Sequence, residues 1–176
     1  PAPARMPVPV ARSSSGPHYP PVRLTTWFYI VMILVCGAVS GILTAWGMTD
    51  RKVTELLFFS WIPIIPAAVF WCIFIFKAWK AIQDDHTVAT PGKALGFMFI
   101  PFFNLYWLFI AIGSWGKEYN GFARRNKLNV EPMSEGVFIA WAVLILLPVP
   151  IANLVLTIIG LVKMASGTNA LADARE

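Results

Sequence analysis

Four long apolar runs dominate the chain, and short polar segments separate them. The runs contain no Asp, Glu, Lys, Arg or His, and they cover residues 27–46, 56–76, 94–112 and 137–162. About 20 apolar residues in a helix cross a hydrocarbon core of about 30 Å. The runs lack the alternation of barrel strands, and helices satisfy their own backbone hydrogen bonds inside lipid. The pattern predicts an all-α membrane protein, a bundle of four transmembrane helices within residues 25–165.

The two ends of the chain differ from the runs. Residues 1–24 carry half of the 14 prolines, which predicts a Pro-rich extended arm rather than a signal peptide. Such an arm has no apolar core of its own, so we expect it to dock onto a partner. Residues 166–176 are predicted to be a C-terminal tail.

Prolines and tryptophans refine the predicted helices. Thr90 followed by Pro91 is typical of an N-cap that opens the third span. Pro63 and Pro66 predict a bend in the second span. Lys77 and Lys80 extend that span into the headgroup layer, where long lysine side chains can reach water. Four tryptophans are predicted to anchor helix ends at the two membrane interfaces, namely Trp27, Trp46, Trp79 and Trp115.

A short helix is predicted beyond the third span. Trp115, Tyr119 and Phe122 have the spacing of one helix face. Two interpretations remain open, because this helix either lies in the membrane interface or simply continues the third span.

The fourth run, Val137 to Val162, is longer than a crossing needs and contains Pro148 and Pro150. We expect a single crossing that is kinked at the prolines, with Asn153 or a neighbouring helix serving a freed carbonyl of Leu144 or Leu146. The competing interpretation is a re-entrant hairpin that enters and leaves on one membrane face.

Two patterns inside the spans are candidate packing or binding features. Gly37, Gly41 and Ala45 form a GxxxG seam that lets a second helix approach closely, either from this chain or from another subunit. A Pro-x-x-Asn-Leu pattern occurs twice, at Pro101 with Asn104 and at Pro150 with Asn153. Each pair indicates a kink with a polar group beside it, and a transport site is the alternative.

The charged residues favour a membrane surface rather than nucleic acid. Only 13% of the residues are charged, and the net charge of +5 is dispersed without a nucleic-acid-binding motif. Basic loops contact anionic headgroups. With four spans, the excess of Lys and Arg favours cytoplasmic termini by a small margin.

No catalytic or metal-binding pattern is evident, so we do not expect an enzyme. Asp84, Asp85 and His86 are adjacent but lack a further ligand, which favours a solvated loop. Both histidines lie outside the spans, which argues against haem ligation within the membrane. Cys36 and Cys72 lie inside spans and are expected to be free and apolar in behaviour. No cofactor is predicted, and bound lipid or pigment stays open.

The segment Ala94–Tyr106, ALGFMFIPFFNLY, resembles the signature of a bacterial family of four-span membrane domains of unknown function. That family has Pro-x-x-Asn-Leu and an aromatic residue in its third span, matched here by Pro101, Asn104 and Tyr106. The resemblance covers about residues 27–165. It implies the bacterial inner membrane and no particular activity.

Three hypotheses for function follow. The first is a non-catalytic subunit or scaffold of a larger membrane complex, with a respiratory or photosynthetic host as a guess, whose partners bind the first span and the arm. The second is a small transporter or channel built around the kinked third and fourth spans. The third, a lipid-modifying enzyme, has the weakest basis, because the spans offer only neutral polar side chains.

Overall fold

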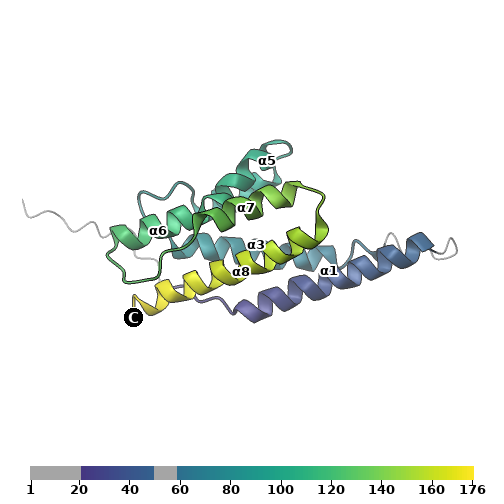
Figure 1. Cartoon of the computed structure of the whole chain (residues 1–176), viewed down its shortest axis with the longest axis horizontal. Coiled ribbons are helices and arrows are strands. Elements are labelled where there is room, and N and C mark those ends of the chain that lie inside the picture. Colours follow the sequence, from purple (N-terminus) through teal and green to yellow (C-terminus); the bar gives the residue numbers. More distant parts are fainter. Residues whose placement is uncertain (1–20, 50–58) are drawn as a thin grey trace, which may run out of the picture.

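The computed structural model describes residues 21–49 and 59–176, and these residues form helices and no strands. Three helices are long and apolar enough to cross a membrane, at Thr26–Thr49, Ile64–Ala81 and Ile151–Asp173. Most helices run roughly along the long axis of the molecule (Figure 1). The expectation of an all-helical membrane protein is therefore confirmed, whereas four crossings are not. Most of the Pro-rich arm and the start of the second run lie outside the described residues.

The first two long helices pair with each other. Helix α1 (Thr26–Thr49) lies against α3 (Ile64–Ala81), where the ring of Phe28 meets Phe70 edge-on at 5.4 Å between centroids. The Ser40 hydroxyl donates a hydrogen bond of 2.6 Å to the carbonyl of Ser60 near the other end of the pair.

The prolines of the second run start a helix instead of bending one. Pro63 is the N-cap residue of α3, and Pro66 lies in its first turn. The first turn of a helix has no intrahelical acceptors for its N–H groups, so proline costs little there. The second run is therefore not a straight helix, as predicted, although the helix is interrupted by a turn at residues 60–63 instead of being bent.

The third predicted span, 94–112, is not one helix. Helix α4 (Pro91–Gly96) and the 3-10 turn η2 (Phe97–Phe99) are followed by a reversal and by α5 (Phe103–Leu108). The N-cap at Thr90 is confirmed, since its hydroxyl accepts from the N–H of Lys93 at 3.3 Å.

The reversal is caused by Pro101 and its neighbours. A residue that precedes proline is pushed out of the helical region, and Ile100 is extended with ψ 115°. Phe102 then takes a positive φ of 63°, a conformation that non-glycine residues rarely adopt. The returning helix folds back onto the first, because the indole of Trp107 donates to the carbonyl of Ala94 at 3.0 Å.

Helix α5 continues almost without a break into α6 (Trp115–Arg125) through the π-helix η3 (Phe109–Gly113). The N–H of Ser114 donates to the carbonyl of Phe109 at 2.8 Å, and the N–H of Glu118 donates to Ser114 at 3.0 Å. Of the two interpretations of the 115–122 helix, continuation of the preceding helix is the one observed. Its predicted face is confirmed but turned inward, since Trp115, Tyr119 and Phe122 are buried.

The fourth predicted span, 137–162, is a helical hairpin. Helix α7 (Glu135–Leu146) ends at an extended Leu147, and α8 (Pro150–Asp173) runs back beside it (Figure 1). The indole of Trp141 donates to the hydroxyl of Thr157 at 3.1 Å across the pair. The expectation of one kinked crossing is wrong, because two prolines two residues apart remove two helical donors at one place.

The predicted role of Asn153 is also wrong. The carbonyl of Leu144 accepts from the backbone N–H of Leu147 at 3.1 Å, so the turn itself satisfies it. Asn153 instead accepts from Thr157 at 3.2 Å within α8.

The core lies between α3, α6, α7 and α8. Its largest fully buried side chains are Trp79, Trp115, Trp141, Tyr119, Phe74 and Phe138. Helix α8 continues to Asp173, so most of the predicted tail from residue 166 is helical and packed.

Candidate functional site

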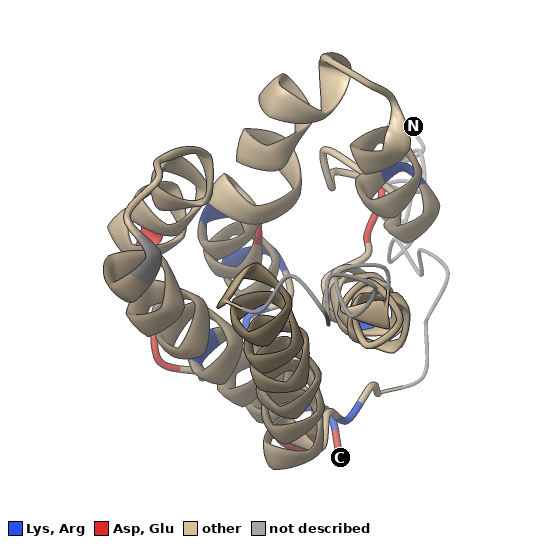
Figure 2. Cartoon of the chain, turned by 90° about the vertical axis from the view of Figure 1, so that its right-hand side faces the viewer, with Lys and Arg blue, Asp and Glu red and all other residues tan. Residues whose placement is uncertain are grey.

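The charged side chains of the described residues gather at one end of the molecule, which we call the polar cap. The cap comprises residues 21–25, the end of α3 from Lys77, the loop 82–90, the first turns of α4 and α7, α6 with the loop 126–134, and α8 from Lys163 onward. The opposite end holds residues 38–49 of α1 and the turns 100–102 and 147–149, which carry no charge. Figure 2 looks from that opposite end, and the turns nearest the viewer are tan.

Asp84 joins the loop after α3 to α6. Its carboxylate accepts two hydrogen bonds from Arg125, of 2.7 and 3.1 Å, and one from the N–H of His86 at 3.0 Å. Burial acts to raise the pKa of Asp84, but hydrogen bonds from Arg125, Thr87 and His86 outweigh it and hold the pKa below its usual value. Asp85 and His86 are exposed, as expected of a solvated loop, whereas Asp84 is partly buried and pairs with Arg125. No group of metal-ligating side chains occurs in residues 21–49 and 59–176.

The C-terminal end of α8 holds the segment before α1. The side chain of Asn169 accepts from the N–H of Leu24 at 2.8 Å and donates to its carbonyl at 2.9 Å. Arg23 pairs with Asp173 and Glu176, both at 2.9 Å. The amide clasp is the stronger anchor, because exposed ion pairs contribute about 0–1 kcal/mol.

Arg175 caps the C-terminal end of α3. Its guanidinium donates to the carbonyl of Ala81 at 2.6 Å and lies over the ring of Phe122, with 4.6 Å from the guanidinium carbon to the ring centroid. Burial lowers the pKa of Arg175, yet an arginine remains charged at any physiological pH. The last carbonyls of a helix need such a donor, so α8 stabilises α3 across the cap.

Two indoles brace the base of the cap. Trp79 of α3 donates to the carbonyl of Ala111 in the π-helix at 2.9 Å, and Trp115 of α6 donates to the carbonyl of Ala78 at 3.3 Å. Both rings are fully buried, so they are not the interfacial anchors that we expected. Trp27 and Trp46 do lie on the surface, with Trp27 75% exposed.

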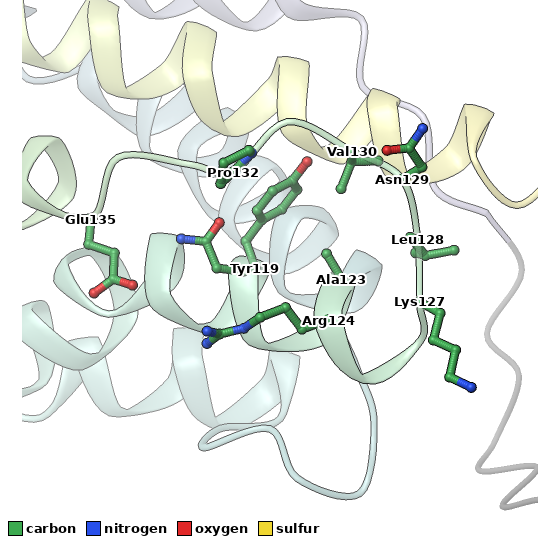
Figure 3. A pocket seen from close by; sticks show the side chains of 10 residues that line it. Tyr119, Ala123, Arg124, Lys127, Leu128, Asn129, Val130, Pro132 and Glu135 are labelled. Carbon is green, nitrogen blue, oxygen red and sulfur yellow. The ribbon is translucent and has the colours of Figure 1, made fainter.

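A cleft of about 440 Å³ lies between α6 and the loop that follows it, and we call it the Tyr119 cleft. Figure 3 shows the Tyr119 ring lying between Pro132 and Val130. Burial, followed by the nearby charge of Glu131, raises the pKa of the Tyr119 phenol. Asn120 holds the loop by accepting from the N–H of Met133 at 2.7 Å and donating to its carbonyl at 2.8 Å. The cleft's charged lining residues among those described are Arg124, Lys127 and Glu135.

A second cleft, of about 520 Å³, lies between residues 21–23, α3 and the end of α4, and we call it the lysine cleft. Its polar side chains are Arg23, Lys77 and Lys80, and its apolar wall includes Ile73 and Phe76. Of the residues that the structure describes, none that lines this cleft carries a carboxylate.

The GxxxG seam of α1 faces outward. Gly37, Gly41 and Ala45 are exposed, and a Cβ added to either glycine would meet no atom within 4 Å. Packing of this seam against another helix of the same chain, one of the two options from the sequence, is not what the described residues show.

The repeated Pro-x-x-Asn-Leu pattern marks the two places where the chain turns back. Pro101 lies in the turn before α5, and Pro150 is the first residue of α8. Asn104 is exposed near the start of α5, whereas Asn153 belongs to the hydrogen-bonded row that links α8 to α7 through Thr157. The structure does not bring the two asparagines together in either described cleft.

Comparisons with family models, with curated proteins and with solved structures find no match to this chain. The resemblance to the four-span bacterial family therefore stays a prediction.

Sequence reasoning missed the polar cap as a unit. Asn120 and Asn169 were the available signals, because a lone amide in a helix with small or charged neighbours often binds a backbone segment. Their partners, Met133 and Leu24, are 13 and 145 residues away, and spacing along the chain does not indicate them.

Proposed function

We propose that this chain is a non-catalytic integral membrane subunit that binds a second membrane protein along α1. We further propose that it resides in the bacterial cytoplasmic membrane, where it stabilises a larger complex. The single observation that carries the proposal is the open seam of Gly37, Gly41 and Ala45 on the outward side of α1.

A seam of small residues matters in lipid because it allows two backbones to approach closely. Gly160 of α8 already allows such a close approach within the chain, since a Cβ on Gly160 would overlap the ring of Trp141. The seam on α1 has the same chemistry without an occupant among the described residues.

The position of α1 supports the same proposal. Its N-terminal half packs on α3, and its C-terminal end projects beyond the turn between α7 and α8 (Figure 1). Large apolar side chains are exposed near the seam, including Ile42, Trp46 and Met48. A helix with this much uncovered surface is the natural attachment point for another subunit.

A catalytic role has no support in the apolar part of the described chain. Residues 26–49, 97–113 and 137–162 carry no ionisable carboxylate, lysine, arginine or histidine. The transporter alternative needs polar groups facing a shared cavity, and Asn104 and Asn153 do not line the two clefts described. We therefore favour the subunit over the transporter.

The orientation that we propose places the polar cap in the cytoplasm. Every Lys and Arg of the described residues belongs to the cap. The positive-inside tendency then favours a cytoplasmic cap, and with it both ends of the described chain. Reporter fusions at the C-terminus test this orientation, since a periplasmic reporter signal would reverse it.

The proposal is tested with affinity-tagged protein purified in mild detergent from its native membrane. We expect a defined partner to co-purify with the wild type and to be lost with Gly41→Leu, because leucine fills the seam. Val39→Phe is the matched control, since it adds bulk at an exposed position about 160° around the same helix. A wild-type particle that contains a single chain, or equal loss with both variants, would contradict the proposal.

A further inference from the structure

The lysine cleft is the feature of the fold that the proposed subunit role does not use. It lies where the cap meets the apolar part of α3, between Arg23, Leu95 and the last two turns of α3. Its three cationic side chains gather on a wall that is otherwise apolar. This combination differs from the Tyr119 cleft, in which Glu135 opposes Arg124 and Lys127.

The positive charge of the cleft is only partly balanced. Arg23 is paired with Asp173 and Glu176. Lys77 contacts the face of Tyr29, with 5.7 Å between its Nζ and the ring centroid. Among the described residues, Lys80 has no ion pair. Two lysines one helical turn apart therefore share one opening, and the described part of its wall carries no carboxylate.

The cleft is continuous with an exposed apolar stripe on α3. Ile65, Val69, Ile73 and Phe76 follow one another at intervals of four, four and three residues, which places them along one face of the helix. The stripe from Ile65 to Phe76 is about 16 Å long, which is roughly half of a hydrocarbon core of about 30 Å. Lys77 and Lys80 follow the stripe at the C-terminal end of α3.

We propose that the lysine cleft binds one anionic phospholipid of the surrounding bilayer. The phosphate lies between the ammonium groups of Lys77 and Lys80, and an acyl chain follows the stripe on α3 through one leaflet. Basic pockets beside membrane helices bind anionic headgroups in this way. The proposal requires only that α3 crosses the membrane, so it does not rest on the partner of α1.

The competing occupants fit less well. Residues 1–20 precede the cleft in the chain, but they contain Arg5 and Arg12 and no carboxylate, so they cannot balance the lysines. A soluble phosphate compound would leave the apolar stripe unused. A zwitterionic lipid would bring its own cation beside the two ammonium groups.

Native mass spectrometry of the intact chain in detergent tests the proposal, with phosphatidylglycerol and phosphatidylcholine as probes. A lysine near a membrane surface contributes roughly a fivefold preference for anionic lipid, so Lys77→Gln with Lys80→Gln should weaken phosphatidylglycerol binding about 30-fold. Lys117→Gln with Lys127→Gln removes the same charge from exposed positions away from the cleft and should leave binding within about twofold of wild type. Equal binding of both lipids by wild type, or equal loss in both double variants, would overturn the proposal.

Cys72 lines the cleft and provides a second readout that does not depend on the lysine variants. In a Cys36→Ala background, phosphatidylglycerol should slow alkylation of Cys72 by a maleimide at least about fivefold, whereas phosphatidylcholine and glycerol phosphate should not. Protection by glycerol phosphate alone would identify a soluble phosphate site instead. Slow alkylation that no lipid alters would mean that the chain itself covers the cleft. Either result would overturn the proposal, and neither would affect the test of the subunit role at Gly41.

Discussion

Two glycines of α8 and two glycines of α1 differ in how closely the rest of the chain packs against them. A Cβ on Gly160 would overlap the indole of Trp141, and a Cβ on Gly167 would overlap the end of the Met133 side chain and press on the ring of Tyr119. The same atom on Gly37 or Gly41 would meet nothing within 4 Å. In α8, Gly160 and Gly167 bring side chains of other helices against the backbone, whereas α1 presents Gly37, Gly41 and Ala45 to the outside.

This difference shows that the apolar character of a surface does not predict whether that surface packs against another part of the chain. Lipid is as apolar as leucine, so close fit rather than hydrophobicity holds helices together within the bilayer. The hairpin fits closely, with fully buried Trp141 and Phe138, while much of α1 remains exposed.

Gly160→Ala should lower the free energy of unfolding in detergent by about 3 kcal/mol, because the added methyl group overpacks a buried indole. The ring cannot turn aside without losing its hydrogen bond to Thr157. Gly37→Ala is the matched control and should change stability by less than about 1 kcal/mol. The measurement is unfolding by titrated denaturing detergent, and equal effects of the two changes would remove the contrast.

Trp79→Phe should cost about 2 kcal/mol, since it leaves the carbonyl of Ala111 without the indole donor in a buried place. Trp27→Phe, at a residue that is 75% exposed, should cost almost nothing under the same conditions. If the two substitutions weaken the protein equally, the indole brace does not contribute to the stability of the cap.

The ion pair of Asp84 with Arg125 should stabilise the cap by about 1 kcal/mol at neutral pH, because both side chains are partly exposed. The folded pKa of Asp84 is lowered, so its contribution is present above the ordinary value of 3.8 and is lost as the pH falls through the folded pKa. Asp84→Asn should therefore be less stable than wild type at neutral pH, and the gap should shrink at about pH 3. A gap that widens on acidification would contradict this assignment.

Gly41→Leu should leave the unfolding of the isolated chain within about 0.5 kcal/mol of wild type, because its Cβ faces open space. This expectation separates stability from assembly, since the same change is expected to remove the proposed partner. A loss of more than about 2 kcal/mol in the isolated chain would show that this face packs against the chain itself.

The two short hairpins show how far pattern reading extends. Pro101 and Pro150 were predicted to kink helices, and each lies where the chain reverses: Pro101 in the turn before α5, and Pro150 as the first residue of α8. The size of the break was underestimated, because a single proline kinks a helix while an extended residue beside it reverses the chain. The extended conformations of Ile100 and Leu147 and the positive φ of Phe102 are backbone states that residue types did not reveal.

The candidate sites divide in the same way. The lysines near the C-terminal end of α3 and the GxxxG seam of α1 could be identified directly from residue spacing. The clasps of Asn169 on Leu24 and of Arg125 on Asp84 join residues 145 and 41 positions apart. Such contacts depend on how whole helices pack, so no local pattern predicts them.

The residue pattern alone predicted a helical chain with segments apolar enough to cross a membrane, because long uncharged runs in lipid satisfy their backbone hydrogen bonds by forming helices. The prolines also marked the places where a continuous helix is disfavoured, at Pro63, Pro101 and Pro148 to Pro150. Whether the chain kinks, begins a helix or reverses direction at each of these prolines depends on how the helices pack against one another. The reason is physical: a turn within an apolar run is tolerated only where its partner helix packs closely beside it, as Trp141 does over Gly160 and Trp107 does at Ala94.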